Sequence, residues 1–224
     1  MRMMSTCKKE TMVSEKHLSF LEEIIKKINN ENISGDIIEC GVWKGGCSMW
    51  MMICQKKYNM ARSFYLYDTF DGMTFPDSDK DDKKAVDIYN KIKQGTYERD
   101  YDKWHKEHKW AFAPIDLVKQ NINLTCYDES KIIYVIGDVC TTLNTNVPLE
   151  ISILRLDTDW YNSTKKELEV LFPLVVKNGY IIIDDYYAWK GSRIATDEFL
   201  VKNREKISMV DTKITGGSFV FQKI

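Results

Sequence analysis

Short apolar runs alternate along the chain with stretches whose apolar residues recur at helical spacing. The short runs predict β-strands over 36–40, 63–67, 131–136, 151–156 and 180–183. Helical spacing predicts a helix that begins after Ser14 as N-cap, helices over 47–55, 163–176 and 192–203, and one that begins near Pro114. Gly179 is the expected end of helix 163–176. Two final runs, 207–210 and 218–222, are joined through Gly216–Gly217 and predict an antiparallel hairpin.

This alternation indicates an α/β fold with a mostly parallel sheet, helices on both faces and a C-terminal antiparallel hairpin. We expect one domain over 1–224, in which 1–34 forms an N-terminal lid or helix. Residues 77–115 are too few for a core of their own, so we expect an insertion or substrate lid. The charge run over 77–84 within it predicts a solvated loop.

Composition narrows the function classes. The net charge is −1, which gives no electrostatic reason to expect nucleic acid or an anionic membrane as a partner. No apolar run reaches the ~20 residues of a membrane span, and the first ten residues lack the apolar stretch of a signal peptide. The six cysteines form no CxxC pair, so we expect free thiols and a cytoplasmic protein. The apolar helix over 47–55 and the aromatic residues of the insertion are compatible with a homodimer.

Two acidic clusters follow two of the predicted strands. Asp157-Thr158-Asp159 ends the run 151–156, and Asp184-Asp185 ends the run 180–183. If these strands are adjacent and parallel, about 4.8 Å apart, their carboxylates converge at a cost that a bound cation would relieve. Oxygen ligands favour a hard ion such as Mg²⁺. We expect Asp157, Asp184 and Asp185 to hold the metal, with Asp159 beside it as a general base.

The loop over 39–46 has neither the GxGxxG spacing of dinucleotide sites nor the GK[ST] of a P-loop. It offers an acid at a strand end, a glycine turn and a helix N-terminus. That combination suits a ligand with an ammonium and a carboxylate, such as S-adenosylmethionine, although a simple βα turn explains it equally well. Asp68 is placed to bind ribose hydroxyls or to cap a turn, and Asp138 to bind an adenine amino group or to form an ordinary turn.

Aromatic residues surround the acidic clusters, namely Trp160, Tyr161, Tyr186, Tyr187 and Trp189. Such rings suit the apolar face of a sugar or an aromatic acceptor, and ordinary packing accounts for them as well.

Five segments together resemble the macrocin O-methyltransferase (TylF-type) family: 11–14, 35–46, 67–73, 156–164 and 179–186. The resemblance runs from about Thr11 to the C-terminus. It implies a class I methyltransferase (Rossmann-like) fold, S-adenosylmethionine and magnesium as cofactors, and methylation of a sugar hydroxyl on a small glycosylated metabolite.

Position by position, the resemblance puts magnesium on Asp157, Asp184 and Asp185 and makes Asp159 the base. It implies cofactor contacts at Thr11, Met12, Ser14, Glu39, Gly41, Val42, Trp43, Ser48, Asp68, Thr69, Phe70 and Asp138. We expect substrate contacts at the five aromatic residues beside the acids and at Trp104 in the insertion. The stretch 77–113 departs from the family pattern, so the resemblance does not define the acceptor.

The sequence therefore favours a magnesium-dependent O-methyltransferase that acts on a glycoside, a nucleotide sugar or a glycan precursor. A catechol-type O-methyltransferase is a close alternative, because the aromatic residues do not separate a sugar from a phenol. A glycosyltransferase would explain the DxD motif, but it explains neither the acid-glycine loop nor the second aspartate pair. A cofactor-binding scaffold with a vestigial site is a non-enzymatic alternative, against which the intact acidic set argues.

Overall fold

The predicted strands assemble into one seven-stranded sheet in the order β5-β2-β1-β6-β7-β9-β8. The computed structural model describes residues 2–97, 105–145, 147–210 and 217–224. Its sheet contains β1 (Asp36–Cys40), β2 (Phe64–Asp68), β5 (Ile132–Ile136), β6 (Ile151–Leu156), β7 (Val175–Ile183), β8 (Ile207–Met209) and β9 (Phe219–Lys223). The first five strands of that order pair in parallel, and β9 pairs antiparallel with both β7 and β8.

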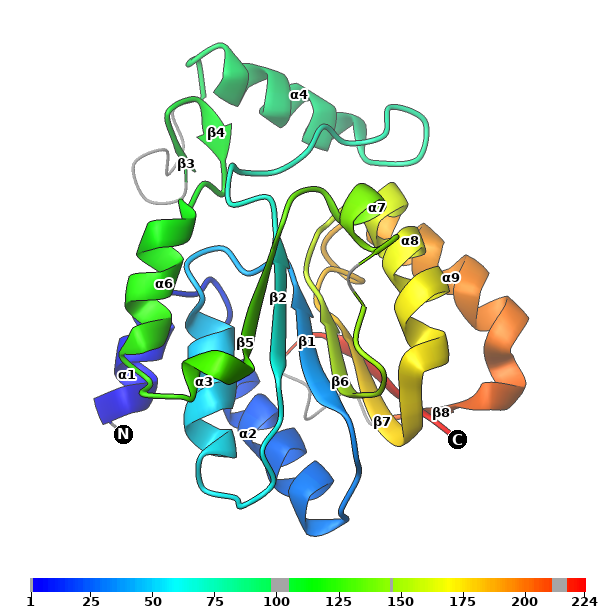
Figure 1. The fold of residues 1–224 in the computed structure, drawn as a ribbon. Helices are drawn as coiled ribbons and strands as arrows, with labels where there is room; N and C mark the ends of the chain where they lie inside the picture. Colours follow the sequence, from blue (N-terminus) through cyan, green and yellow to red (C-terminus); the bar gives the residue numbers. More distant parts are fainter. Residues whose placement is uncertain (1, 98–104, 146, 211–216) are drawn as a thin grey trace.

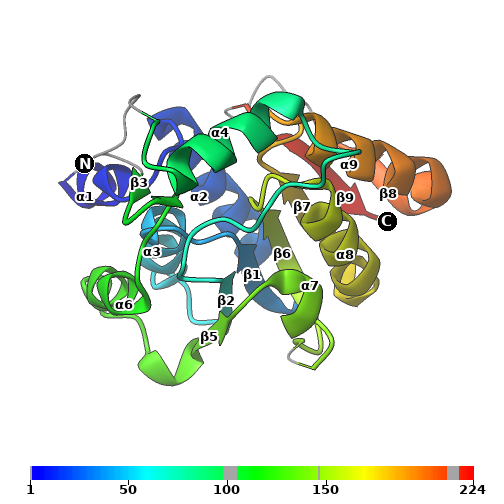
Figure 2. The ribbon, with the colours of Figure 1, turned by 90° about the horizontal axis from the view of Figure 1, so that it is seen from above.

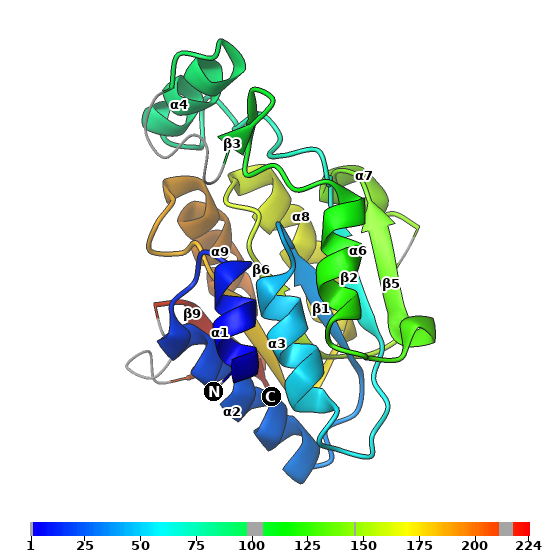
Figure 3. The same ribbon diagram turned by 90° about the vertical axis from the view of Figure 1, so that its left-hand side faces the viewer.

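Helices cover both faces of this sheet (Figures 1 and 3). One face carries α1 (Arg2–Lys9), α2 (Glu15–Asn30), α3 (Gly46–Gln55) and α6 (Ile115–Asn123), and the other carries α7 (Val139–Thr142), α8 (Tyr161–Leu171) and α9 (Lys190–Asn203). Short 3₁₀ turns lie at η1 (Glu129–Lys131), η2 (Phe172–Leu174) and η3 (Arg204–Lys206). Separate apolar clusters fill the two sides of the sheet. The predicted α/β architecture, with its mostly parallel sheet and C-terminal antiparallel pair, is confirmed.

Local sequence explains most boundaries. Strand β6 is buried along its whole length, as expected for a central parallel strand. Ser14 caps α2 as predicted, because its Oγ accepts a hydrogen bond from the His17 amide at 3.2 Å. The predicted helix 163–176 is wrong at its end, since α8 stops at Leu171 and is followed by the 3₁₀ turn Phe172–Leu174, which contains Pro173. Gly179 therefore lies inside β7 and does not end a helix.

Helix α3 has nearly all of its side chains buried. It packs against α1, α2 and α6 of the same chain. Because its apolar surface is covered within the chain, α3 no longer supports the expectation of a homodimer. Helices α1 and α4 (Lys83–Lys93) were not predicted from the sequence.

The insertion contains α4 and a short hairpin of β3 (His105–Lys106) and β4 (Lys109–Trp110), and it lies over the carboxyl edge of the sheet (Figures 1 and 2). The predicted solvated loop is wrong at Asp81, which is only 4% exposed. Asp81 Oδ1 accepts a hydrogen bond from the Tyr161 amide at 2.9 Å, and Asp82 Oδ2 accepts one from the Lys190 amide at 2.9 Å. The acidic run therefore satisfies the first amides of α8 and α9, which helix geometry leaves without partners.

Two further expectations concern the cysteines and membrane-spanning helices. All six cysteines are free thiols, as predicted. Across the part of the chain that the structure describes, no helix is both long and apolar enough to cross a bilayer.

Candidate active site

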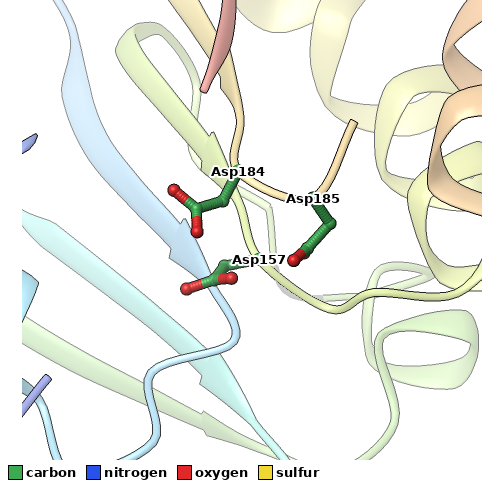
Figure 4. A group of neighbouring side chains, drawn as sticks. All are labelled: Asp157, Asp184 and Asp185. Atoms are coloured by element: carbon green, nitrogen blue, oxygen red, sulfur yellow. The ribbon is translucent and has the colours of Figure 1, made fainter. Parts of the chain in front are cut away.

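Three carboxylates converge at the carboxyl ends of two adjacent strands. Strands β6 and β7 pair in parallel with Leu156 opposite Ile183, so the residues that follow each strand emerge side by side. One oxygen each of Asp157, Asp184 and Asp185 lies within 4.8 Å of the others. Figure 4 shows the three side chains turned toward one another. The predicted metal ligands are thus brought together, and their all-oxygen donor set fits a hard divalent cation.

A buried arginine lies beneath these carboxylates. Arg155 is 1% exposed, and its Nη1 lies 2.8 Å from Glu39 Oε1 and 2.7 Å from Asp157 Oδ2. Its Nη2 lies 3.1 Å from Asp184 Oδ1. Burial alone would lower the pKa of Arg155, but the surrounding acids, Asp157 first, raise it well above its usual range. Arg155 is therefore a permanent internal cation, which compensates part of the negative charge but not all of it.

The protein also holds Asp184 from its other side. Ser218 Oγ donates a hydrogen bond to Asp184 Oδ1 at 2.9 Å, and His17 Nδ1 lies 3.6 Å from the same oxygen. Burial lowers the pKa of His17 to about 4. Burial would raise the pKa of Asp184, but Arg155 and the Ser218 hydrogen bond outweigh it and lower that pKa. Asp184 is accordingly an ionised carboxylate in a fixed orientation.

Asp159 lies beside this group in a tight turn. Its backbone has a left-handed φ of 67°, and its amide donates to Asp185 Oδ2 at 3.2 Å. The preceding Thr158 donates its hydroxyl to buried Glu167 on α8, which anchors the turn. Burial, with repulsion from Asp157 and Asp184, raises the pKa of the Asp159 carboxyl to about 7. A carboxyl with such a pKa is suited to accept a proton near neutral pH.

An open pocket lies at the same edge of the sheet, with about 690 Å³ of empty space when the adjoining solvent is included. It is lined by Asp157, Asp159 and six of the residues predicted to bind the cofactor: Met12, Gly41, Trp43, Asp68, Thr69 and Asp138. Further lining residues were not predicted: Tyr67, Gly72, Met73, Thr74, Ala111, Gly137, Val139, Thr158 and Ser163. Several of these last residues are small or apolar, and nothing in their own sequence context distinguishes them.

Asp68 and Asp138 have capping roles at the pocket wall. Asp68 Oδ2 accepts hydrogen bonds from the Val42 and Trp43 amides at 2.7 and 2.9 Å, and its Oδ1 accepts one from the Phe70 amide at 2.7 Å. Asp138 Oδ1 accepts one from the Cys140 amide at 2.8 Å. Both residues line the pocket as well. A carboxylate has about four acceptor sites, so Asp138 keeps capacity for a ligand, whereas the Thr69 hydroxyl, 3.4 Å from Asp68 Oδ1, takes the fourth site of Asp68.

The other predicted cofactor residues do not line the pocket; they are Thr11, Ser14, Glu39, Val42, Ser48 and Phe70. Glu39 is the clearest difference, because it was expected to face the ammonium group of a ligand. It is 1% exposed, and its two oxygens are bonded to Arg155 and to the Ser48 hydroxyl. Burial raises the pKa of Glu39, although Arg155 acts against this. Its partner is the protein's own cation, which the sequence analysis had overlooked in the middle of an apolar strand.

The structure divides the predicted acceptor residues between separate places. Trp160 and Trp189 pack edge to face with Trp110 of the insertion, with ring centroids 5.3–5.8 Å apart. Tyr186 stacks on Phe219 at 4.2 Å, and Tyr187, 57% exposed, packs at its edge. The Tyr161 hydroxyl donates to Glu198 on α9. Trp104 lies outside the described residues.

Comparison with known proteins agrees with this fold. The profile of the macrocin-O-methyltransferase (TylF) family matches residues 6–223. The 8-demethyl-8-(2,3-dimethoxy-α-L-rhamnosyl)-tetracenomycin-C 4'-O-methyltransferase of Streptomyces olivaceus is 29% identical over 177 residues, which are 79% of this chain and 62% of that protein. The demethyldecarbamoylnovobiocin O-methyltransferase of Streptomyces niveus is 28% identical over 211 residues, 92% of this chain and 71% of that protein. The chain thus spans about two thirds of the length of these relatives.

Among solved structures, the O-methyltransferase NovP superposes with a TM-score of 0.76 at 24% identity. The match covers 96% of this chain and 82% of that chain. The predicted class I methyltransferase fold is confirmed by this superposition.

A substitution at Gly41 tests how closely the loop after β1 approaches the backbone of Asp157 after β6. Its φ is 83°, and a Cβ at this position would lie 1.9 Å from the carbonyl oxygen of Asp157. We expect Gly41→Ala to lower the free energy of unfolding in urea by more than about 3 kcal/mol, because backbone on backbone cannot give way. Gly45→Ala is the matched control, since Gly45 has a φ of 90° but contacts only side chains at 3.4 Å or more. It should cost about 1–2 kcal/mol. Equal losses of stability in the two variants would show that Gly41 is not in close contact with the backbone of Asp157.

Proposed function

The chain belongs to the macrocin O-methyltransferase (TylF) family, and from that premise we propose that it is an S-adenosylmethionine- and Mg²⁺-dependent O-methyltransferase. Its acceptor would be a sugar hydroxyl of a glycoside, a nucleotide sugar or a glycan precursor. One observation carries the proposal: three carboxylates lie within 4.8 Å of one another, and one of them, Asp157, lines an open pocket together with Asp159. The two curated relatives described above are both named as O-methyltransferases.

The pocket suits the methyl donor. Gly41 lets the backbone of the loop after β1 approach the strand ends without a side chain, which keeps space for a ligand beside Asp157. Asp138 presents a carboxylate on the same wall, where an adenine amino group would find an acceptor. Asp68 would accept ribose hydroxyls in exchange for its long contact with the Thr69 hydroxyl. In open parallel sheets, ligands bind beyond the carboxyl ends of the strands, as here.

The carboxylates suit a magnesium ion. Asp157, Asp184 and Asp185 would hold it, because they offer oxygen ligands and a negative charge that Arg155 only partly compensates. When bound, such a cation would lower the pKa of an acceptor hydroxyl beside it.

Asp159 would complete the reaction as the base. Its carboxylate would take the proton from the acceptor hydroxyl, and S-adenosylmethionine, when bound in the pocket, would supply the methyl group to the acceptor oxygen and leave as S-adenosylhomocysteine. The turn that positions Asp159 is held through its own amide and through Thr158, so the base has a defined place. Positioning of both reactants between the pocket and this turn would supply much of the rate acceleration.

A sugar O-methyltransferase and a catechol-type O-methyltransferase would differ in the residues that bind the acceptor. Trp110, Trp160 and Trp189 join the insertion to the loops that carry the acids, and indole faces suit both sugars and phenols. A catechol-type acceptor therefore belongs in the same assay as the sugars.

The test is methyl transfer from labelled S-adenosylmethionine by purified protein to a panel of nucleotide sugars, glycosides and catechols. We expect transfer to a sugar hydroxyl, loss of that transfer in EDTA, and recovery when excess Mg²⁺ is added. Full activity in EDTA would refute the metal role. Transfer to catechols alone would refute the sugar assignment.

Asp159→Asn tests the base. Asparagine tolerates the left-handed φ of 67°, so the turn should persist while the proton acceptor is lost. We expect kcat to fall about 10²–10⁴-fold, with the affinity for S-adenosylhomocysteine measured by calorimetry unchanged. Asp79→Asn, at an exposed position in the insertion, is the control and should keep full turnover. A loss of cofactor affinity in Asp159→Asn would show that Asp159 has another role.

A further inference from the structure

Arg155 donates a hydrogen bond to one oxygen of Asp157 and forms an ion pair with one oxygen of Asp184, two of the proposed metal ligands. Its Nη1 donates to Asp157 Oδ2 at 2.7 Å, and its Nη2 lies 3.1 Å from Asp184 Oδ1. Ser218 Oγ also donates to Asp184 Oδ1, at 2.9 Å. Within the described part of the chain, no residue donates a hydrogen bond to Asp157 Oδ1 or Asp184 Oδ2. Each carboxylate therefore has one oxygen tied to the protein and one left for a ligand.

This division matters because divalent cations differ in how they use carboxylates. Mg²⁺ is small, takes six ligands in near-octahedral geometry and usually binds one oxygen of each carboxylate. Ca²⁺ is larger, takes six to eight oxygens and often binds both oxygens of a carboxylate. When one oxygen of a carboxylate is bonded to a guanidinium, the carboxylate can bind a cation through both of its oxygens only if that bond breaks. The fork of Arg155 is also buried, so water cannot readily replace it.

From these contacts we infer that Arg155 is a positioning residue that makes the site selective for Mg²⁺ over Ca²⁺, by keeping Asp157 and Asp184 to one free oxygen each. The inference rests on the proposed metal-dependent function and deepens it. Glu39 supports the arrangement, because its Oε1 lies 2.8 Å from the same Nη1 and fixes the guanidinium from the side of β1.

The ratio of the Mg²⁺ and Ca²⁺ affinities distinguishes a role of Arg155 in coordination from a role in charge balance or in the stability of the fold. Removal of a buried positive charge would strengthen the binding of every divalent cation, and damage to the fold would weaken the binding of every one. Only a change in coordination mode alters Mg²⁺ and Ca²⁺ affinities in opposite senses. The ratio of their dissociation constants is therefore the readout, and it requires no turnover.

The experiment follows Mn²⁺ bound to the purified protein by electron paramagnetic resonance and displaces it with Mg²⁺ or Ca²⁺. We expect the wild-type protein to bind Mg²⁺ at least about tenfold more tightly than Ca²⁺. In the double variant Arg155→Met/Glu39→Gln, which leaves no unpaired buried charge at this pair, we expect the preference to fall by about tenfold. The single variant Glu39→Gln is the matched control and should keep the wild-type ratio, because the amide oxygen of glutamine can still accept a hydrogen bond from Nη1 and keep Arg155 against both aspartates.

Arg155→Lys is the second variant, since it keeps a buried positive charge if the double variant does not fold. A single ammonium lacks the two-armed geometry of guanidinium, so we expect the Mg²⁺ preference to fall here too. A wild-type preference for Mg²⁺ that persists in a folded Arg155 variant would overturn the inference and leave the proposed function intact. A wild-type protein that binds no Mn²⁺ would refute the metal role and the inference together.

Discussion

The structure depends on the compensation of negative charge at the tips of parallel strands. The register of β6 and β7 places Leu156 opposite Ile183, so the aspartates that follow must meet. The register of β1 and β6 places Glu39 opposite Arg155, so a guanidinium lies on the same side of the sheet as the acids. A buried charge is tolerated only when it is paired, and this arrangement pairs most of them within the chain. The remaining negative charge is what makes the place suitable for a cation.

The same contacts connect parts of the protein that are distant in sequence. Arg155 joins Glu39 of β1 to Asp184, a proposed metal ligand after β7. Ser218, at the start of β9, and His17 on α2 hold that ligand from the opposite side. Above the site, Asp81 of the insertion bonds the first amide of α8, two residues after Asp159. These side-chain contacts therefore link the carboxylates to β1, α2, α8 and the insertion.

The sequence was sufficient for the sheet and for the convergence of the aspartates, because both follow from local periodicity and from acids at strand ends. It was insufficient for Arg155, which was read as part of an apolar run although a charge inside a buried strand demands a partner. Asp81 was missed because a charge run is usually solvated, and only tertiary structure shows which helix ends it meets. The end of α8 was misplaced since Val175 and Val176 fit a helix and a strand equally well, and pairing with β6 decides between them. Glu39 was assigned to a ligand because its internal partner had not been recognised.

The most direct test of the central claim is a crystal structure with Mn²⁺ and S-adenosylhomocysteine, with anomalous scattering recorded at the manganese edge. The account predicts a manganese peak bonded to one oxygen each of Asp157, Asp184 and Asp185, with the Arg155 guanidinium still on Asp157 and Asp184. A map without a peak between these carboxylates, or a metal that displaces Arg155 from them, would contradict it.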